Sequence, residues 1–170
     1  MTDAPIQALA GLLDREAIPY ALIGGHAVNA LLAPRLTRDI DVTIVADAAA
    51  TARLRAAFEA EGFRVEGQFG ADQPSGPDFV RFVREPVVIE IQLAKTRFQH
   101  ELVQRGRAEG GVRIASPEDL IVLKLIADRP KDQDDLRGLA LLPAIDWDYI
   151  GRWAEEWGVA DRLARLRSGG

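Results

Sequence analysis

The chain has 170 residues, of which 48% are hydrophobic and 28% charged, with a formal net charge of −5 and no cysteine. This composition is too apolar for a disordered chain, and it excludes disulfides and thiolate metal sites. The negative net charge argues against broad, non-specific binding of nucleic acid. Residues 1–5 lack the basic start of a signal peptide, and no segment reaches transmembrane length, so we expect a cytoplasmic protein without a membrane partner.

The first 115 residues alternate between patterns typical of helices and patterns typical of strands. Apolar spacing and the flanking Gly and Pro residues predict helices at 5–17, 26–32 and 48–61, and strands at 20–23, 39–45, 63–66, 79–83, 87–93 and 112–115. The two strands at 79–83 and 87–93 look like a hairpin pair. The Gly-, Pro- and Asp-rich segment 68–77 predicts a loop.

Residues 116–170 carry only helical patterns. Ser116, Pro117, Glu118 and Asp119 provide an N-cap, a proline at the first helical position and acids in the first turn, which predicts a helix over 116–127. Two or three more helices follow. The sequence therefore predicts an α/β core at 1–115 and a C-terminal helical part at 116–170 that packs on it.

Gly24 and Gly25 follow the strand at 20–23 directly and precede a helix. Free backbone N–H groups at a helix start bind anions, and glycine lets a phosphate approach the backbone closely. The pair therefore predicts a phosphate-binding turn.

Asp39 and Asp41 alternate with Ile40 and Val42 in the next strand. Residues i and i+2 of a strand point to the same face, roughly 7 Å apart. Two carboxylates so close repel each other unless a cation lies between them, and their hard oxygens suit Mg²⁺, with Mn²⁺ as an alternative. A phosphate cradle beside such a pair is typical of phosphoryl or nucleotidyl transfer.

The segment Gly24-Gly25-His26-Ala27, followed by Arg35-Leu36-Thr37-Arg38-Asp39-Ile40-Asp41, resembles the signature of the polymerase-β-type nucleotidyltransferase superfamily. It is similar above all to the small bacterial minimal nucleotidyltransferases and the AbiEii-like toxin enzymes. The resemblance implies a mixed β-sheet flanked by helices, with Asp39 and Asp41 as catalytic and metal-binding residues. It spans roughly residues 20–136.

Members of this superfamily usually add a third carboxylate, an aspartate, from a neighbouring strand. Glu90 is the candidate here, as a metal ligand or as the base for the acceptor hydroxyl, because it lies in the apolar run 87–93. Asp78 is a weaker alternative. An edge-strand glutamate in water, with no catalytic role, remains open.

Three basic residues complete the predicted site. Arg35 and Arg38 could hold triphosphate oxygens or neutralise the aspartates. Lys124 stands in an apolar helix, and Asp132 and Asp135 follow at positions that share a helix face. The run around them resembles the AbiEii-like pattern, in which the matching lysine helps to form the nucleotide site; snorkelling of Lys124 to solvent is the alternative.

The predicted function is a Mg²⁺-dependent transfer of NMP from an NTP such as ATP to a hydroxyl acceptor, with release of pyrophosphate. The acceptor could be a protein, a tRNA or a small molecule, and the resemblance also implies a toxin role with a cognate antitoxin as partner. A catalytically degenerate binding or interaction module with the same fold is the alternative.

Overall fold

The computed structural model describes residues 4–70 and 78–169, which form two compact units. Of the described residues, the first unit comprises 4–27, 35–70 and 78–115, and the second comprises 28–34 and 116–169. The predicted division of the chain into domains at residue 115 stays a prediction.

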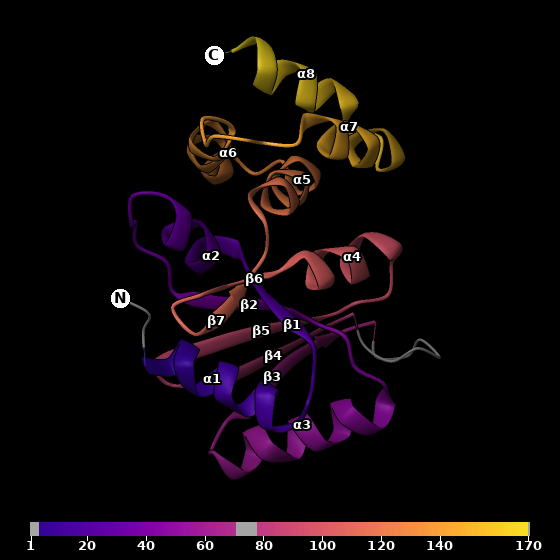
Figure 1. Cartoon of the computed structure of the whole chain (residues 1–170). Coiled ribbons are helices and arrows are strands. Elements are labelled where there is room, and N and C mark those ends of the chain that lie inside the picture. Colours follow the sequence, from indigo (N-terminus) through magenta and orange to yellow (C-terminus); the bar gives the residue numbers. More distant parts are fainter. Residues whose placement is uncertain (1–3, 71–77, 170) are drawn as a thin grey trace. The chain divides into compact units, whose positions relative to one another are not determined.

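The first unit is built on a seven-stranded mixed sheet with the order β3-β4-β5-β2-β1-β7-β6 (Figure 1). Its strands are β1 Tyr20–Ile23, β2 Asp39–Ile44, β3 Arg64–Phe69, β4 Phe79–Arg84, β5 Val87–Leu93, β6 Arg107–Glu109 and β7 Val112–Ile114. The pairs β2–β5 and β1–β7 are parallel, and the remaining pairs are antiparallel. The predicted mixed sheet flanked by helices is confirmed.

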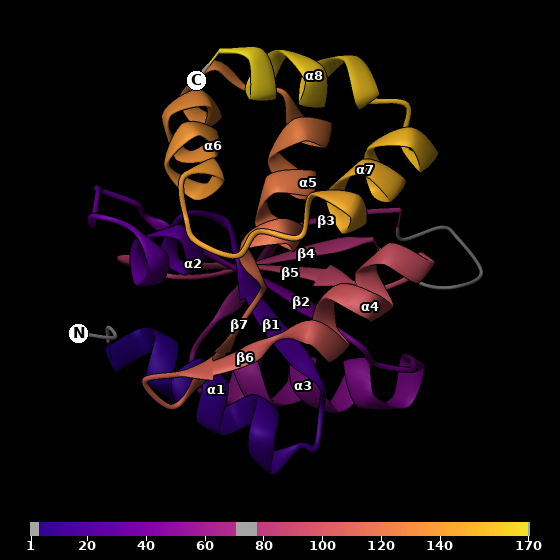
Figure 2. The ribbon, with the colours of Figure 1, turned by 45° about the horizontal axis from the view of Figure 1, so that its top comes forward.

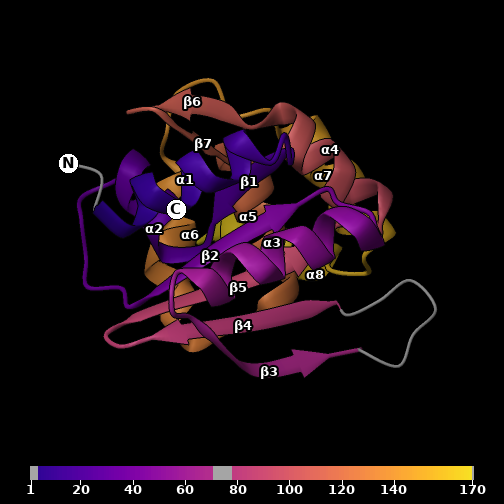
Figure 3. The same cartoon turned by 90° about the horizontal axis from the view of Figure 1, so that it is seen from below.

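Helices α1 (Ala4–Arg15) and α3 (Ala48–Ala60) cover one face of this sheet (Figure 3). Phe58 of α3 stacks on Phe82 of β4, with ring centroids 4.5 Å apart, and Ile89 of β5 is buried on the same side. Burial of these large apolar side chains makes the largest favourable contribution to the free energy that holds the helices on the sheet. Helix α4 (Arg97–Arg105) lies on the opposite face and packs against β1 and β2.

The second unit is helical, with α5 Pro117–Ala127, a 3₁₀ turn η1 Pro130–Asp132, α6 Gln133–Ala140, α7 Trp147–Glu156 and α8 Ala160–Ser168. Helix α5 packs against α6 and α7, and α7 packs against α8 (Figure 2). Ser116 caps α5 as predicted, because its side chain accepts a hydrogen bond from the backbone N–H of Asp119. None of the described helices is long and apolar enough to cross a bilayer.

The structure differs from the predicted elements at a few places. Helix α2 (Gly24–Leu31) begins at Gly24, so the two glycines form its first turn and no separate turn precedes it. Strand β3 continues through Phe69 because it pairs with β4, whereas residues 71–77 of the predicted loop lie outside the described residues. Helix α4 and strand β6 were not predicted; α4 begins at a capping box of Thr96 and Gln99, a signal that the sequence does contain.

Candidate active site

Three carboxylates share one face of the sheet in the first unit. Asp39 and Asp41 alternate along β2 with Ile40 and Val42, which are buried, and Glu90 of β5 pairs directly with Asp41 across the parallel ladder. Side chains of neighbouring in-register strand residues point the same way. The fold therefore brings together the predicted residues Asp39, Asp41 and Glu90 on the face opposite α1 and α3.

The two glycines make room for side chains of this site. Gly24 has a φ of +65°, and a Cβ built there would lie 2.1 Å from Oδ2 of Asp41. A Cβ on Gly25 would lie 2.4 Å from Oγ1 of Thr37. The space beside both α-carbons is thus taken by Asp41 and Thr37, and the first turn of α2 lies next to the carboxylate of Asp41. An N-terminal helix turn in this place is suited to binding phosphate.

Gly24→Ala should disturb both the backbone and Asp41. A left-handed conformation costs a non-glycine residue about 1–2 kcal/mol, and the new methyl group would push the Asp41 carboxylate away. We expect a melting temperature below that of the wild type, and a loss of transfer activity on the order of a hundredfold, as is found for misplaced catalytic groups.

Gly151→Ala is the matched control for this change, because nothing lies within 4 Å of a Cβ at that helical position. It should leave activity unchanged and keep or raise the melting temperature. Wild-type activity in Gly24→Ala would show that Asp41 tolerates displacement.

Arg81 of β4 is a site residue that was not singled out from the sequence as a partner of the carboxylates. Its Nη1 donates a short hydrogen bond to Oε1 of Glu90 and lies 3.7 Å from Oδ2 of Asp39, while its Nε donates to Oε2 of Glu66 at 2.9 Å. The hydrogen bond to Glu66, followed by those to Glu90 and the charge of Asp39, raises the pKa of Arg81 above its ordinary value against the opposing effect of burial. The guanidinium is therefore a permanent cation among these three carboxylates.

The donor chemistry of the site fits a divalent cation. Asp39, Asp41 and Glu90 offer the hard oxygens that Mg²⁺ and Mn²⁺ prefer, and a positive group, Arg81, already balances two of them. Among residues 4–70 and 78–169, however, no three His, Asp or Glu side chains converge as a ready-made metal site. Glu90 faces Arg81 in this arrangement, so Asp39, Asp41 and Glu90 remain predicted ligands.

Three other predicted residues of the first unit precede strands in the chain: Arg35 and Arg38 come before β2, and Asp78 comes directly before β4. Arg35 and Arg38 belong to the exposed segment between α2 and β2, and Nη1 of Arg35 donates to the carbonyl of Leu36. Their contact with a triphosphate stays a prediction. Asp78, the weaker candidate for the third carboxylate, forms an ion pair with Lys95 at 2.7 Å.

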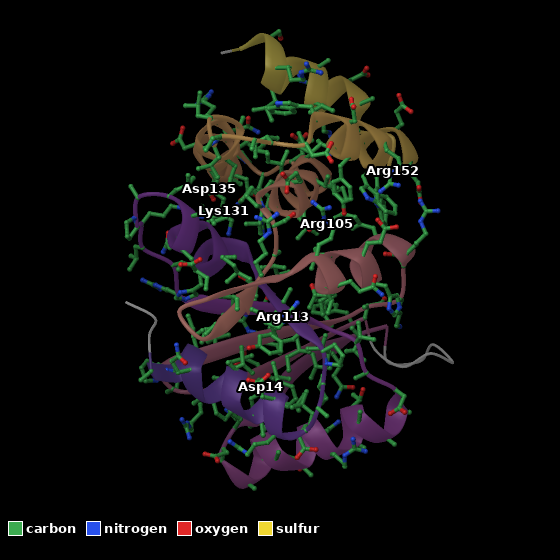
Figure 4. All side chains as sticks on the ribbon, viewed as in Figure 1. Asp14, Arg105, Arg113, Lys131, Asp135 and Arg152 are labelled. Atoms are coloured by element: carbon green, nitrogen blue, oxygen red, sulfur yellow. The ribbon has the colours of Figure 1, made fainter. Side chains whose placement is uncertain are left out.

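Lys124 lies inside the helical unit in a buried ion cluster. Its Nζ donates to Oδ1 of Asp132 at 2.9 Å and to Oδ2 of Asp135 at 2.7 Å, and all three side chains are at most 5% exposed. Asp135 comes from α6, as labelled in Figure 4, and Arg129 adds a hydrogen bond to Asp132. The predicted pairing of Lys124 with the two aspartates is present, and the snorkelling alternative is wrong. A role of Lys124 in nucleotide binding stays a prediction.

The cluster should make stability depend on acid pH. Burial by itself raises the pKa of Asp132, but the hydrogen bonds from Arg129 and Lys124 outweigh it, so the pKa is lower than the ordinary value. A carboxyl whose pKa is lowered on folding stabilises the fold above its unfolded pKa of about 3.9, and this contribution is lost as the pH falls through the folded pKa. We expect Asp132→Asn to lower the free energy of unfolding by about 2 kcal/mol at pH 7.

This difference between wild type and Asp132→Asn should shrink below about pH 4, because the carboxyl of the unfolded chain then binds a proton while that of the folded protein, whose pKa is lower, is still ionised. Urea unfolding of both proteins from pH 7 to pH 3 measures it. A difference that stays constant over that range would mean that the charge of Asp132 contributes nothing to stability.

Several solved nucleotidyltransferase structures are similar to this fold. The solution structure of the antibiotic-resistance factor ANT(2'')-Ia matches with a TM-score of 0.64 at 19% identity, covering 99% of this chain and 98% of that one. The lincosamide antibiotic adenylyltransferase LnuA, in a lincomycin-bound crystal structure, matches with a TM-score of 0.63 at 18% identity, covering 83% and 98%. An antigenic nucleotidyltransferase-like protein from Paracoccidioides brasiliensis matches with a TM-score of 0.58 at 21% identity, covering 96% and 90%. At these identities the likeness establishes the fold, which is that of the nucleotidyltransferases.

The family follows from the sequence itself. The chain belongs to the family described as nucleotidyltransferases of unknown function (DUF6036), whose model matches residues 1–164. A search of the curated proteins finds no match. The predicted class, a nucleotidyltransferase, is confirmed, whereas the finer resemblance to minimal nucleotidyltransferases and AbiEii-like toxins stays a prediction.

Proposed function

We propose that this protein transfers a nucleoside monophosphate from an NTP to a hydroxyl group of an acceptor, with Asp39, Asp41 and Glu90 as the metal-binding carboxylates. The observation that carries the proposal is that these carboxylates lie on one face of the sheet in the first unit, with Asp41 beside Gly24 at the start of α2. A Mg²⁺ ion bound there would neutralise charge on the phosphates and on the leaving pyrophosphate.

The residues of the chain have distinct roles in this reaction. Backbone N–H groups of Gly24 and Gly25 bind phosphate oxygens at the positive end of α2, and the exposed Arg35 and Arg38 add charge to the same phosphates. The acceptor oxygen forms a bond to the α-phosphorus, and the bond from that phosphorus to the pyrophosphate oxygen breaks. Asp41 or Glu90 takes the proton of the acceptor hydroxyl.

We propose a small molecule as the acceptor. Two proteins of similar fold were solved with small molecules bound: ANT(2'')-Ia in complex with adenylyl-2''-tobramycin, and LnuA with lincomycin. This chain covers nearly the whole length of both, 97% and 98%. A protein or tRNA acceptor, and a toxin function with a cognate antitoxin, rest on the motif resemblance alone.

Calorimetric titration of each NTP with Mg²⁺ into the wild type and into Asp41→Asn tests the site without knowledge of the acceptor. We expect one NTP to bind only with the metal, and binding to be lost in the variant. Incubation of that labelled NTP with panels of hydroxyl-bearing small molecules, tRNA and proteins then identifies the acceptor class. Absence of metal-dependent binding in a folded sample would contradict the proposal.

A catalytically degenerate nucleotide-binding module is the second candidate. The observation that favours it is the hydrogen bond of Glu90 to Arg81, which engages the predicted third carboxylate. Metal-dependent NTP binding without transfer to any acceptor in the panels would support this candidate.

A further inference from the structure

The guanidinium of Arg81 contacts two sets of carboxylates through different nitrogens. Nη1 contacts Glu90 and Asp39 in the candidate site. Nε donates a hydrogen bond to Glu66 on the edge strand β3, at 2.9 Å. Glu66 is not one of the predicted metal ligands, and its side chain is 42% exposed. Arg81 therefore has one set of contacts inside the site and an independent contact outside it.

A divalent cation and Nη1 of Arg81 compete for the same two carboxylates. Oε1 of Glu90 accepts a hydrogen bond from Nη1, and a metal bound to Asp39 or Glu90 would lie within a few ångströms of that positive group. Like charges at such a distance repel, so a bound metal weakens the hold of the guanidinium on these carboxylates, and the guanidinium weakens the binding of the metal. Arg81 can leave without losing all of its partners, because the Nε contact to Glu66 lies outside the site.

We propose that Arg81 is a built-in competitor for the divalent cation: it holds the site carboxylates in the metal-free protein and withdraws to Glu66 when the metal binds. The inference rests on the proposed function, since it requires Asp39 and Glu90 to be metal ligands. Such a competitor lowers the apparent metal affinity by the fraction of molecules in which the site is open. It keeps Asp39 and Glu90 paired until the metal arrives.

Binding of Mn²⁺ alone, measured by calorimetry or by electron paramagnetic resonance on the full chain, tests this proposal. Arg81→Gln should bind Mn²⁺ about three- to tenfold more tightly than the wild type, the range that one or two partly exposed ion pairs provide. Arg84→Gln is the matched control. It removes the same charge from β4, but Arg84 is exposed, stacks over the Phe63 ring at 4.5 Å and contacts no site carboxylate in the described structure.

An equal gain in Mn²⁺ affinity in Arg81→Gln and Arg84→Gln would show that the effect comes only from the loss of one positive charge, and it would overturn the proposal. Weaker binding in Arg81→Gln would overturn it as well, since Arg81 would then support the metal. Binding of Mn²⁺ to none of these proteins would contradict the proposed function itself, and the inference would fall with it.

Glu66→Gln gives a second measurement, and the single variant is informative even if Arg81→Gln does not fold, because unchanged or tighter Mn²⁺ binding in it would overturn the proposal. Removal of the outer partner should weaken Mn²⁺ binding by about two- to fivefold when Arg81 is present, because the guanidinium loses its alternative contact. The same change in an Arg81→Gln background should have no effect on Mn²⁺ binding. An equal effect in both backgrounds would show that Glu66 acts through its own charge and would overturn the proposal.

Discussion

Asp41→Asn is expected to lower nucleotidyl transfer by about a thousandfold or more while leaving the fold intact. Asparagine has nearly the shape of aspartate, so the packing against Gly24 is kept, but the negative charge that the metal requires is lost. Metal stabilisation of phosphoryl transition states contributes several kcal/mol, and each 1.36 kcal/mol is about tenfold in rate. Asp39→Asn should have a similar effect. Transfer of labelled nucleotide to the identified acceptor, with thermal unfolding as the check on folding, measures both.

Asp14→Asn is the matched control for these variants. Asp14 is exposed on α1, labelled in Figure 4, and α1 covers the sheet face opposite the carboxylates. This variant should keep wild-type activity. Full activity in both Asp39→Asn and Asp41→Asn would contradict the proposed site.

Lys124→Met should destabilise the protein by about 3–5 kcal/mol, the usual cost of breaking a buried ion pair from one side. The reason is that Asp132 and Asp135 are 1% and 5% exposed, and each would lose a charged hydrogen-bond donor at less than 3 Å. Arg129 still donates a hydrogen bond to Asp132 in this variant. The midpoint of urea unfolding at pH 7 measures the loss.

Lys131→Met removes an exposed lysine from η1, labelled in Figure 4, and should change stability by less than about 0.5 kcal/mol. Comparison of NTP binding in the two variants separates a structural role of Lys124 from the predicted nucleotide role. Normal NTP binding by folded Lys124→Met would leave only the structural role, and unchanged stability would contradict the importance of the cluster.

Local sequence patterns were sufficient to predict most of the helices and strands. The strand at Tyr20–Ile23 has the predicted bounds, β2 and α3 differ from theirs by a single residue at the end, and the capped start of α5 is as predicted. These features depend on side-chain periodicity, caps and breakers, which act within a few residues. The candidate pair Asp39 and Asp41 follows from the same local rule, since alternate strand residues share a face.

The partner of Glu90 required the pairing of strands. The two-residue turn between β4 and β5 places Arg84 opposite Val87, and counting three residues back and forward places Arg81 opposite Glu90. That register could have been deduced from the expected hairpin, but the additional contacts of Arg81 with Glu66 and Asp39 could not. They depend on β3 lying beside β4 and on β2 lying beside β5. The second of these neighbours does not follow from chain order, because β2 precedes β3 in the sequence.

The sequence by itself determined the class of this protein, the positions of most helices and strands, and the carboxylates and glycines of the candidate site, because these are written in short-range patterns. Only the tertiary structure decided what lies next to them: Asp41 and Thr37 in the space left by the glycines, Arg81 among the site carboxylates, and Lys124 between two buried aspartates. Contacts between residues distant in sequence are set by sheet order and helix packing, which depend on the burial of the whole apolar surface and on no single motif.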